Sequence, residues 1–527
     1  MRGITTTNTV RTIRSLHHGR IPRPLLAHDP TKERVVILGS GWAGFTISRH
    51  LDKNKFQTVV VSPRSYFVFT PLLASTAVGT LEFRNTLEPV RGRNAGVEYI
   101  QGWADDVSFD RKTLTIEALT SQPRGGSHAD KAGASGQGEL FDIKYDKLIV
   151  AVGCYSQTFG TKGVRENALF LKDVGDARRI RSFETASLPT TSEELRKNIL
   201  NFAIVGGGPT GVEFAAELFD LCHEDLSRLY PTLIPYVKIS IYDVAPKILP
   251  MFDAKLATYA LNLFKRDGIK IKTEHHIQEL RPGLPGPPGE NLNTAGCFTL
   301  TTQEEGDIGV GMCVWSTGLM MNPFVQKALD SVHIYPESSA IPNLPENAPD
   351  LPSSLKWSLK RHSKTGGLMV DDRFRVQLVE SNLATEATVV DVFAVGDVSV
   401  MENSPLPATA QVANQEARWL AEHLNTGDIN SHRFSFRNLG VMTYLGGMRA
   451  IMQTGEREIK GRTAWLIWRG AYLTKTSSCR PEGRSDSYGV NGSSRKRSPS
   501  SHAKLSVQGS IIITNISIAY SQKTSSA

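Results

Sequence analysis

The chain has 527 residues, 40% of them hydrophobic and 21% charged, which is enough for two or three globular domains with sizeable cores. Its formal net charge is +8, but much of the excess lies in the two ends without interleaved aromatic residues, so we predict no nucleic-acid partner. The five cysteines show no C-x-x-C, C-x4-C or metal-ligand spacing, which argues against a disulfide framework and predicts no metal site.

Residues 1–30 have the composition of a mitochondrial transit peptide. The segment before Asp29 is rich in arginine and in the hydroxyl residue threonine and contains no acidic residue, as expected of a basic amphipathic leader. A disordered basic tail is the alternative. No run of 18 apolar residues occurs in the chain, so the sequence predicts no transmembrane helix.

A first nucleotide-binding turn follows the leader. The apolar run at 34–38 leads into G-S-G-W-A-G and a helical pattern, and a second apolar strand is predicted at 56–61. In such a βαβ unit Gly39 allows the tight turn, Gly41 lets a pyrophosphate approach the backbone, and Gly44 lets helix and strand pack closely.

The end of that second strand departs from the usual fingerprint. Ser62 and Arg64 stand where an acidic residue normally binds the ribose of the nucleotide. We predict that Ser62 hydrogen-bonds a ribose and that Arg64 faces phosphate or adenine.

A second turn of the same kind lies near the middle of the chain. The apolar run at 199–205 meets a G-x-G-x-x-G turn formed by Gly206, Gly208 and Gly211, a helical pattern follows, and a further strand ends at Asp243. The carboxylate of Asp243 is placed to accept both hydroxyls of an adenosine ribose. Two such turns in one chain indicate a flavoprotein with FAD in the first turn and a nicotinamide nucleotide in the second.

The chain then returns to the first domain near residue 320. A predicted strand at 310–315 is followed by a turn containing Thr317 and Gly318, and an apolar strand beginning at 391 ends at Gly396 and Asp397. The predicted fold class is α/β, with two nested Rossmann-like dinucleotide-binding domains.

Several longer motifs together resemble the type II (alternative) NADH:ubiquinone oxidoreductases of mitochondria, of the fungal and plant kind. The resemblance covers roughly residues 33–475. The motifs are G-S-G-W-A-G (39–44), V-S-P-R-S-Y-F-V-F-T-P-L-L (61–73), V-G-G-G-P-T-G-V-E (205–213), S-T-G (316–318), F-A-V-G-D (393–397) and A-Q-V-A-N-Q-E-A (410–417).

The resemblance implies roles for matching residues at the flavin. Trp42 is expected near the point where nicotinamide enters, and Asp397 is expected to hydrogen-bond the ribityl chain of FAD. Gln411 and Gln415, four residues apart on one helix face, are expected beside the flavin where the quinone arrives. Trp42 as plain packing and the two glutamines as surface polar residues are the alternatives, and Glu416 is expected to be a solvated helix carboxylate rather than a proton donor.

The resemblance also implies roles for the nucleotide domain and for the whole enzyme. Glu213 follows the second glycine turn within the NADH site, and the charge of Asp243 favours NADH over NADPH. The enzyme would oxidise NADH, use FAD as cofactor and reduce ubiquinone without pumping protons. It would contact the mitochondrial inner membrane peripherally, and a leader without a stop-transfer segment favours the matrix side. A homodimer is one expectation, because dimers are common in this family.

The predicted organisation divides the chain into six segments. They are a transit peptide (1–30), the first part of the FAD-binding domain (31–198), the NADH-binding domain (199–309), the second part of the FAD-binding domain (310–430), a short C-terminal membrane and quinone region (431–476) and an atypical disordered tail (477–527). In the fifth segment Trp465, Leu466, Trp468 and Tyr472 form either an interfacial face or a core-packing helix. The amphipathic anchor that usually ends the family is missing from the tail.

Two other functions fit parts of the pattern. A sulfide:quinone reductase needs a reactive cysteine pair at the flavin, for which Cys154 and Cys313 are the only conceivable residues. A non-catalytic flavoprotein of the apoptosis-inducing-factor kind would use NADH binding to change its oligomeric or partner state.

Overall fold

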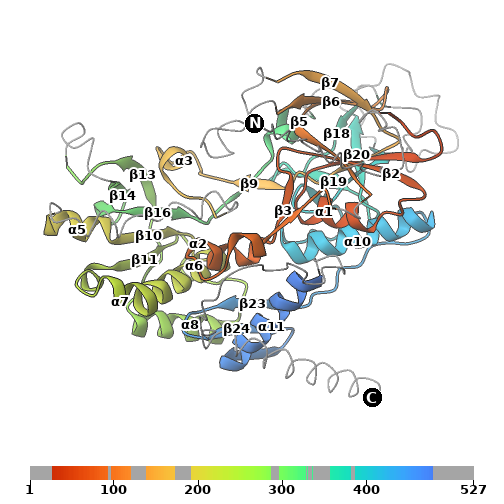
Figure 1. Cartoon of the computed structure of the whole chain (residues 1–527). Helices are drawn as coiled ribbons and strands as arrows, with labels where there is room; N and C mark the ends of the chain where they lie inside the picture. Colours follow the sequence, from red (N-terminus) through yellow and green to blue (C-terminus); the bar gives the residue numbers. More distant parts are fainter. Residues whose placement is uncertain are drawn as a thin grey trace, which may run out of the picture.

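The computed structural model describes residues 27–92, 96–119, 138–171, 192–286, 296–327, 329, 335, 357–380 and 386–478. Residues 1–26 of the predicted leader and residues 479–527 of the predicted tail lie outside this part of the chain. The described residues form two lobes and a smaller C-terminal unit beside the second lobe (Figure 1).

The first lobe is built on an 11-stranded sheet whose centre is parallel. Its middle strands are rich in β-branched residues and buried on both faces, as parallel strands covered on two sides require. The strand order is β22 (Ser399–Met401), β19 (Leu368–Val370), β20 (Arg375–Glu380), β21 (Glu386–Ala394), β8 (Lys147–Val150), β1 (Glu33–Leu38), β2 (Phe56–Ser62), β5 (Glu98–Ser108), β6 (Thr113–Ala118) and β7 (Leu140–Lys144), with β18 (Trp357–Leu359) paired to β20.

Helix α1 (Trp42–His50) and helix α10 (Ala410–Thr426) pack against each other in this lobe, although they are far apart in the chain. Helix α10 begins where the Thr409 hydroxyl accepts the Val412 N–H, and it ends at Gly427 in the left-handed conformation. Figure 1 shows both helices below the sheet. Helix α10, which belongs to the predicted second part of the FAD-binding domain, therefore lies beside the first glycine turn.

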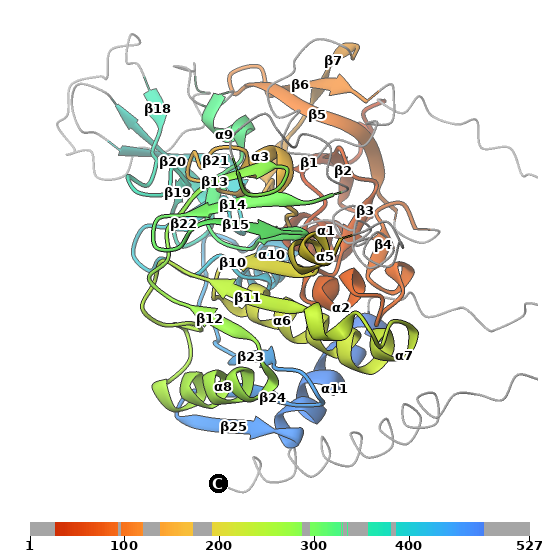
Figure 2. The same ribbon diagram turned by 90° about the vertical axis from the view of Figure 1, so that its left-hand side faces the viewer.

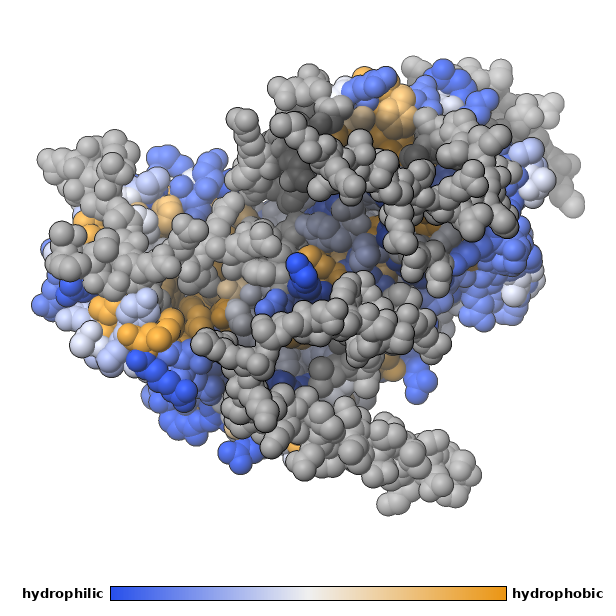
Figure 3. All heavy atoms as spheres, viewed as in Figure 1, coloured by the Kyte–Doolittle hydropathy of each residue, from blue (hydrophilic) through white to orange (hydrophobic). Residues whose placement is uncertain are grey.

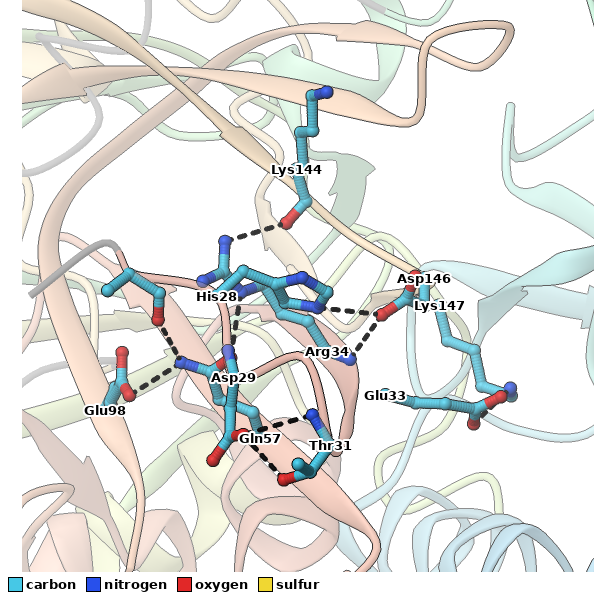
Figure 4. Close-up of polar contacts among 11 residues, drawn as sticks. His28, Asp29, Thr31, Glu33, Arg34, Gln57, Glu98, Lys144, Asp146 and Lys147 are labelled. Atoms are coloured by element: carbon cyan, nitrogen blue, oxygen red, sulfur yellow. Dashed lines mark hydrogen bonds and ion pairs between the residues drawn. The ribbon is translucent and has the colours of Figure 1, made fainter.

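Polar contacts attach the start of the described chain to this sheet (Figure 4). The Gln57 side chain accepts the Asp29 N–H at 3.0 Å and donates to the Ala27 carbonyl at 3.0 Å. The Asp146 carboxylate accepts the Arg34 N–H at 2.6 Å and lies 3.2 Å from His28. Residues 27–29, which lie in the predicted leader segment, therefore contact this sheet.

The second lobe contains a four-stranded parallel sheet and a three-stranded antiparallel sheet. The parallel order is β12 (Lys270–Lys272), β11 (Lys238–Tyr242), β10 (Asn201–Val205) and β16 (Met312–Trp315), and the antiparallel order is β13 (Ile277–Pro282), β14 (Phe298–Thr302) and β15 (Gly306–Val310). Its helices are α3 (Val164–Asn167), α5 (Glu193–Ile199), α6 (Pro209–Asp220), α7 (Ser227–Leu229) and α8 (Ala254–Asp267). Because β16 pairs with β10, this sheet continues past residue 309, the predicted limit of the domain.

Short elements connect the two lobes. Strand β9 (Cys154–Ser156) pairs antiparallel with β17 (Leu319–Met321), so the chain's exit from the first lobe and its return lie side by side. Helix α9 (Pro323–Lys327) follows β17. Strands β3 (Tyr66–Val68) and β4 (Leu87–Pro89) pair antiparallel, and the segment between them contains α2 (Leu73–Ala77), which contacts α6.

The C-terminal unit consists of a three-stranded antiparallel sheet and a helix. Its elements are β23 (Val441–Tyr444), β24 (Ala450–Thr454), β25 (Arg457–Gly461) and α11 (Arg462–Ser478), and Figure 2 shows them beside α8. Trp468 stacks on Tyr444 with ring centroids 5.3 Å apart, and Tyr472 meets Phe69 edge-on at 5.9 Å. Trp468 and Tyr472 therefore pack inward, as in the core-packing alternative.

Exposed apolar side chains occur on the second lobe and the C-terminal unit. Leu229, Val244 and Met251 are exposed in the lobe, and Met448 and Leu466 are exposed in the unit. In the view of Figure 3, hydrophobic residues gather over the second lobe, whereas hydrophilic residues cover the right-hand flank of the first. Within the described residues no helix combines the length and apolar character needed to cross a bilayer.

Candidate active site

The first glycine turn joins β1 to α1 and leaves its middle residue open. Gly39 has a φ of +105°, and a Cβ there would lie 2.4 Å from the Ala151 carbonyl oxygen. A Cβ on Gly44 would lie 2.1 Å from the Gly39 carbonyl oxygen, which explains why helix and strand approach so closely. A Cβ on Gly41 would meet nothing within 4 Å, so the space above the N-terminus of α1 is free for a ligand.

The second glycine turn, between β10 and α6, repeats this geometry. Gly206 has a φ of +117°, and a Cβ on Gly211 would lie 2.0 Å from the Gly206 carbonyl oxygen. A Cβ on Gly208 would again meet nothing within 4 Å. Both turns thus present free space at a helix N-terminus, where backbone N–H groups and the helix dipole favour an anion.

Two serines that the sequence analysis did not single out pin these turns. The Ser40 hydroxyl lies 3.0 Å from the Ser62 hydroxyl and 3.1 Å from the Arg64 carbonyl oxygen. The Ser316 hydroxyl donates to the Val205 carbonyl at 3.0 Å beside the second turn. Ser40 lies within the first glycine motif and Ser316 directly precedes Thr317 and Gly318, and these positions could have indicated from the sequence that both serines contact the turns.

The side chains of Ser62 and Arg64 face the first turn differently. The Ser62 hydroxyl is buried and accepts the Arg64 N–H at 3.2 Å, so the loop itself engages it. The Arg64 side chain is partly buried, and its positive charge acts on the Tyr155 hydroxyl. The arginine therefore lies between the first sheet and the strands that connect the lobes.

Asp243 follows β11 and shapes the second turn directly. One carboxylate oxygen accepts the Gly207 N–H at 2.5 Å, and the other accepts the Ala245 N–H at 2.8 Å. These bonds hold a negative charge beside the glycine turn. Thr317 and Gly318 lie across the same sheet edge, in the loop after β16, where Gly318 has a φ of +73°.

Gly396 and Asp397 form a turn after β21, at the same edge of the first sheet as Gly39. Gly396 has a φ of +77°, and an added Cβ would lie 3.4 Å from the Cβ atoms of both Ala43 and Ala413. The Asp397 carboxylate accepts a hydrogen bond from the Cys154 thiol, with 3.1 Å between sulfur and oxygen. Strands that are distant in sequence thus bring Asp397 beside the first glycine turn.

Glu416 is buried behind this turn, and the expectation of a solvated carboxylate was wrong. Its side chain is 3% exposed and accepts the Gly396 N–H at 2.6 Å. Burial raises the pKa of Glu416 to about 8, the bond from Gly396 opposes that rise, and the nearby charge of Asp397 adds to it.

Trp42, the first residue of α1, lies in an aromatic cluster. Its ring meets Phe67 and Phe69 edge-on with centroids 5.0 Å apart in each case, and its N–H donates to the Thr70 hydroxyl at 2.9 Å. Trp42 is partly exposed and packs against the hydrophobic clusters of both lobes, so it lies at the boundary between them.

The amides of Gln411 and Gln415 bind the chain segment just before β23. Gln411 accepts the Leu439 N–H at 3.1 Å and donates to the Gly440 carbonyl at 3.3 Å. Gln415 accepts the Arg437 N–H at 3.1 Å and donates to its carbonyl at 2.9 Å. Both glutamines therefore join α10 to the start of the C-terminal unit.

Glu213 points away from the glycine turn toward the C-terminal unit. Its carboxylate accepts the Tyr444 N–H at 3.1 Å, and burial raises its pKa to about 8. Glu217 and Asp220 continue the same face of α6, and burial raises the pKa of both. Of this row of acids sequence analysis named only the first: Glu213 and Asp220 bind the C-terminal unit, whereas Glu217 accepts the Ser75 hydroxyl of α2 at 2.6 Å.

The residues present fit two dinucleotides. Each turn has an open middle glycine at a helix N-terminus, and each is bordered by an aspartate held in place by hydrogen bonds. Asp397 borders the first turn and Asp243 borders the second. A fold with two such turns on two parallel sheets, the second inserted into the first, defines the class of two-dinucleotide oxidoreductases, and the predicted nested α/β fold is confirmed.

Comparison with known proteins narrows this class. The family model described as pyridine nucleotide-disulphide oxidoreductase matches residues 33–332. The chain is 35% identical to a probable NADH dehydrogenase of Dictyostelium discoideum over 461 residues, covering 85% of this chain and 86% of the relative. It is 31% identical to the mitochondrial internal alternative NAD(P)H-ubiquinone oxidoreductase A1 of Solanum tuberosum, covering 85% of this chain and 84% of the relative.

A solved structure agrees at the level of the fold. NDH2 from Plasmodium falciparum, solved in complex with NADH, aligns with a TM-score of 0.66 at 22% identity, covering 84% of this chain and 94% of that chain. The chain belongs to the type II (alternative) NAD(P)H–ubiquinone oxidoreductases, within the pyridine nucleotide-disulphide oxidoreductase family. The resemblance in the sequence motifs is thereby confirmed.

Proposed function

We propose that this protein is a non-proton-pumping NADH:ubiquinone oxidoreductase of mitochondria. The observation that carries the proposal is the pair of open glycine turns in one chain that belongs to this family. FAD, when bound, would accept a hydride from NADH and pass two electrons on to the quinone. Positioning is the main task left to the protein, because hydride transfer requires the donor and acceptor rings to be stacked closely.

The first turn would hold FAD and the second would hold NADH. Gly39, Gly41 and Gly44 would surround the FAD pyrophosphate, and Asp397 would orient the ribityl chain. Gly206, Gly208 and Gly211 would surround the NADH pyrophosphate. Thr317 and Gly318 would line the NADH side, and Ser62 and Arg64 would border FAD. Trp42 would lie where nicotinamide approaches the flavin, as its position between the lobes supports.

Quinone would reach the flavin near the junction of α10 with the C-terminal unit. Gln411 and Gln415 would act there by fixing the 437–440 segment, since their amides bind its backbone. Exposed Leu466 and Met448 support peripheral contact of this unit with the mitochondrial inner membrane. The protein would lie on the matrix side of that membrane and would form a homodimer.

Anaerobic stopped-flow spectroscopy tests the proposal. NADH should bleach the flavin absorbance within one turnover time, and a short-chain ubiquinone should restore it at a rate comparable with steady-state turnover. Rapid bleaching without reoxidation by quinone would instead favour a non-catalytic flavoprotein. Comparison of the full chain with one lacking residues 477–527 would show whether the tail is needed for quinone access.

The nucleotide preference provides a second test. Because the Asp243 carboxylate is held beside the second turn, its charge should repel the 2′-phosphate of NADPH. We expect Asp243→Asn to lower the ratio of kcat/KM for NADH over NADPH at least about tenfold, which corresponds to about 1.4 kcal/mol. Asp253→Asn, in the same lobe before α8, should leave the ratio unchanged. An unchanged ratio of kcat/KM for NADH over NADPH in Asp243→Asn would contradict a role of Asp243 in nucleotide preference.

The sulfide:quinone alternative lacks a suitable cysteine pair among the described residues. Cys313 is buried in the core of the second lobe, where burial raises its pKa to about 12. Cys154 instead contacts Asp397 at the edge of the first sheet. Because Cys313 is buried with a raised thiol pKa, it does not meet the requirement of redox exchange at a flavin for an accessible, easily ionised thiol.

A further inference from the structure

We propose that Glu416 is a positioning residue for FAD, holding the Gly396–Asp397 turn in the shape that receives the cofactor through a bond to the turn's backbone. This inference rests on the proposed function, because it assumes FAD in the first turn. It assigns a purpose to a buried acid that the hydride and quinone chemistry does not itself use.

The backbone geometry makes the turn dependent on few contacts. After β21 the chain leaves the sheet at Val395, whose N–H donates to the Val150 carbonyl at 3.1 Å. Gly396 then adopts a φ of +77°, and its carbonyl accepts the Ser399 N–H at 2.9 Å. The Gly396 N–H points away from the sheet, and Glu416 accepts it at 2.6 Å. Without Glu416 this N–H would be left in a closed environment with no protein acceptor described for it.

Packing restricts the turn from two sides. A Cβ added to Gly396 would touch Ala43 of α1 and Ala413 of α10 at 3.4 Å each, so the turn is held between the two helices. Ala413 and Glu416 lie one turn apart on α10, on the same face. Helix α10 therefore acts on the turn in two ways. Ala413 sets how closely the turn approaches the helix, and the carboxyl of Glu416 sets the orientation of the turn's backbone.

The charge balance indicates a neutral carboxyl at Glu416. The side chain is 3% exposed, and among the described residues the charged group acting on it is Asp397, a second acid. A negative charge at Glu416 would lie in a site closed to solvent and would be repelled by Asp397, so the Glu416 carboxyl holds its proton. A protonated Glu416 still accepts the Gly396 N–H through its other oxygen. The Asp397 carboxylate then remains available to accept hydrogen bonds from the ribityl hydroxyls.

The test compares Glu416→Gln with Glu416→Leu in the full-length holoenzyme. Glutamine keeps a neutral acceptor oxygen, so we expect FAD affinity, the visible flavin spectrum and the flavin midpoint potential to match those of the natural protein. Leucine removes the acceptor, so we expect FAD affinity to fall at least about tenfold and the flavin spectrum to shift. Glu422→Gln, an exposed acid on the same helix, is the matched control and should change none of these.

Further measurements separate local from global effects. NADH affinity at the second lobe, measured on the same variants by fluorescence, should stay unchanged; its loss in Glu416→Leu together with FAD would indicate general misfolding, and Glu416→Gln alone would then decide. FAD release from the natural protein should increase as the pH rises through about 8, and Glu416→Gln should abolish that increase.

Three results would overturn the proposal. Equal FAD affinity and equal spectra in Glu416→Leu and the natural protein would reject it while leaving the proposed function intact. Loss of FAD in Glu416→Gln equal to that in Glu416→Leu would show that the charge itself is needed, which contradicts a neutral positioning group. A natural protein that binds no FAD would reject the proposed function as well.

Discussion

Within each glycine turn the three glycines meet different physical requirements. The first must adopt a positive φ, the third has no room for a side chain, and the second has open space above it. A substitution at the second position should therefore affect ligands, and one at the third should affect folding. Within the six residues of each turn, the second glycine thus serves ligand binding and the third serves stability.

The variants Gly208→Val and Gly211→Val would test this distinction between binding and folding. The valine at 208 would fill the space predicted for the pyrophosphate, so the Kd for NADH should rise more than about tenfold while the melting temperature changes little. The valine at 211 would collide with the Gly206 carbonyl oxygen, so it should lower the melting temperature by several degrees. Nucleotide titration and thermal denaturation measure the two effects, and equal behaviour of the two variants would contradict the assignment.

At this scale the sequence predicted the glycines well and the polar side chains less well. A glycine motif fixes backbone geometry locally, so Gly39 and Gly206 could be placed from the sequence alone. The partner of a long side chain depends instead on which distant segment packs against it. Glu213 was therefore assigned to the nucleotide, although its carboxylate contacts Tyr444.

Among the elements, helix α10 joins three parts of the molecule. Its start borders the Gly396 turn, its buried face packs on α1, and its glutamines hold the 437–440 segment. A helix was expected here from the motif at 410–417, which places Gln411 and Gln415 four residues apart on one face. Its contact with the C-terminal segment was not, because the sequence carries no signal for backbone groups that a glutamine will bind.

We expect Gln415→Ala to loosen that segment without unfolding the helix. The variant loses two hydrogen bonds to Arg437, and these backbone groups are near solvent, so the stability loss should be about 1 kcal/mol. Amide hydrogen exchange around residues 437–440 should become faster. Arg418→Ala, which removes a bond to Asn414 within α10, should leave that exchange unchanged. Unaltered exchange in Gln415→Ala would show that the amide contributes nothing to holding the segment.

For the molecule as a whole, two acids with raised pKa values couple stability to pH. Glu213 and Glu416 each have a pKa raised to about 8, so the folded state binds a proton that the unfolded chain releases near its ordinary value of 4.5. Their contribution to stability is complete below about pH 4.5, decreases as the pH rises toward 8, and levels off above it. Within that window each group should lower the unfolding free energy by up to about 1.4 kcal/mol per pH unit.

The variant Glu213→Gln should remove part of this dependence. Denaturant unfolding at pH 5, 6, 7 and 8 should give a shallower decline in stability than the natural protein shows. Glu194→Gln, an exposed acid on α5, is the matched control and should keep the natural slope. An unchanged slope in Glu213→Gln would mean that this carboxyl titrates at its ordinary pKa in the folded protein.

The overall architecture was largely predictable because the two glycine motifs and their strands are local and repeated. The extent of the second sheet was less predictable. A strand at 310–315 was expected, but its own sequence does not show that residues 312–315 pair with β10. The inward packing of Trp468 likewise depends on Tyr444, which the sequence could not place beside it. Long-range pairing accounts for both differences.

The stretch from residue 437 to residue 449 is bonded at both ends to different lobes. Its start is held by the glutamines of α10, and its end is held by Asp220, which accepts the Gly447 N–H, and by Asp267, which lies 3.0 Å from Arg449. Such a crosslink limits hinge opening, so the gap between flavin and nicotinamide would be set when the chain folds rather than when NADH arrives. Small-angle X-ray scattering should then give the same radius of gyration with and without NADH. A Gln411→Ala, Gln415→Ala double variant should instead become more compact when NADH is added. If the natural protein contracted on adding NADH, the lobes would move freely despite this link.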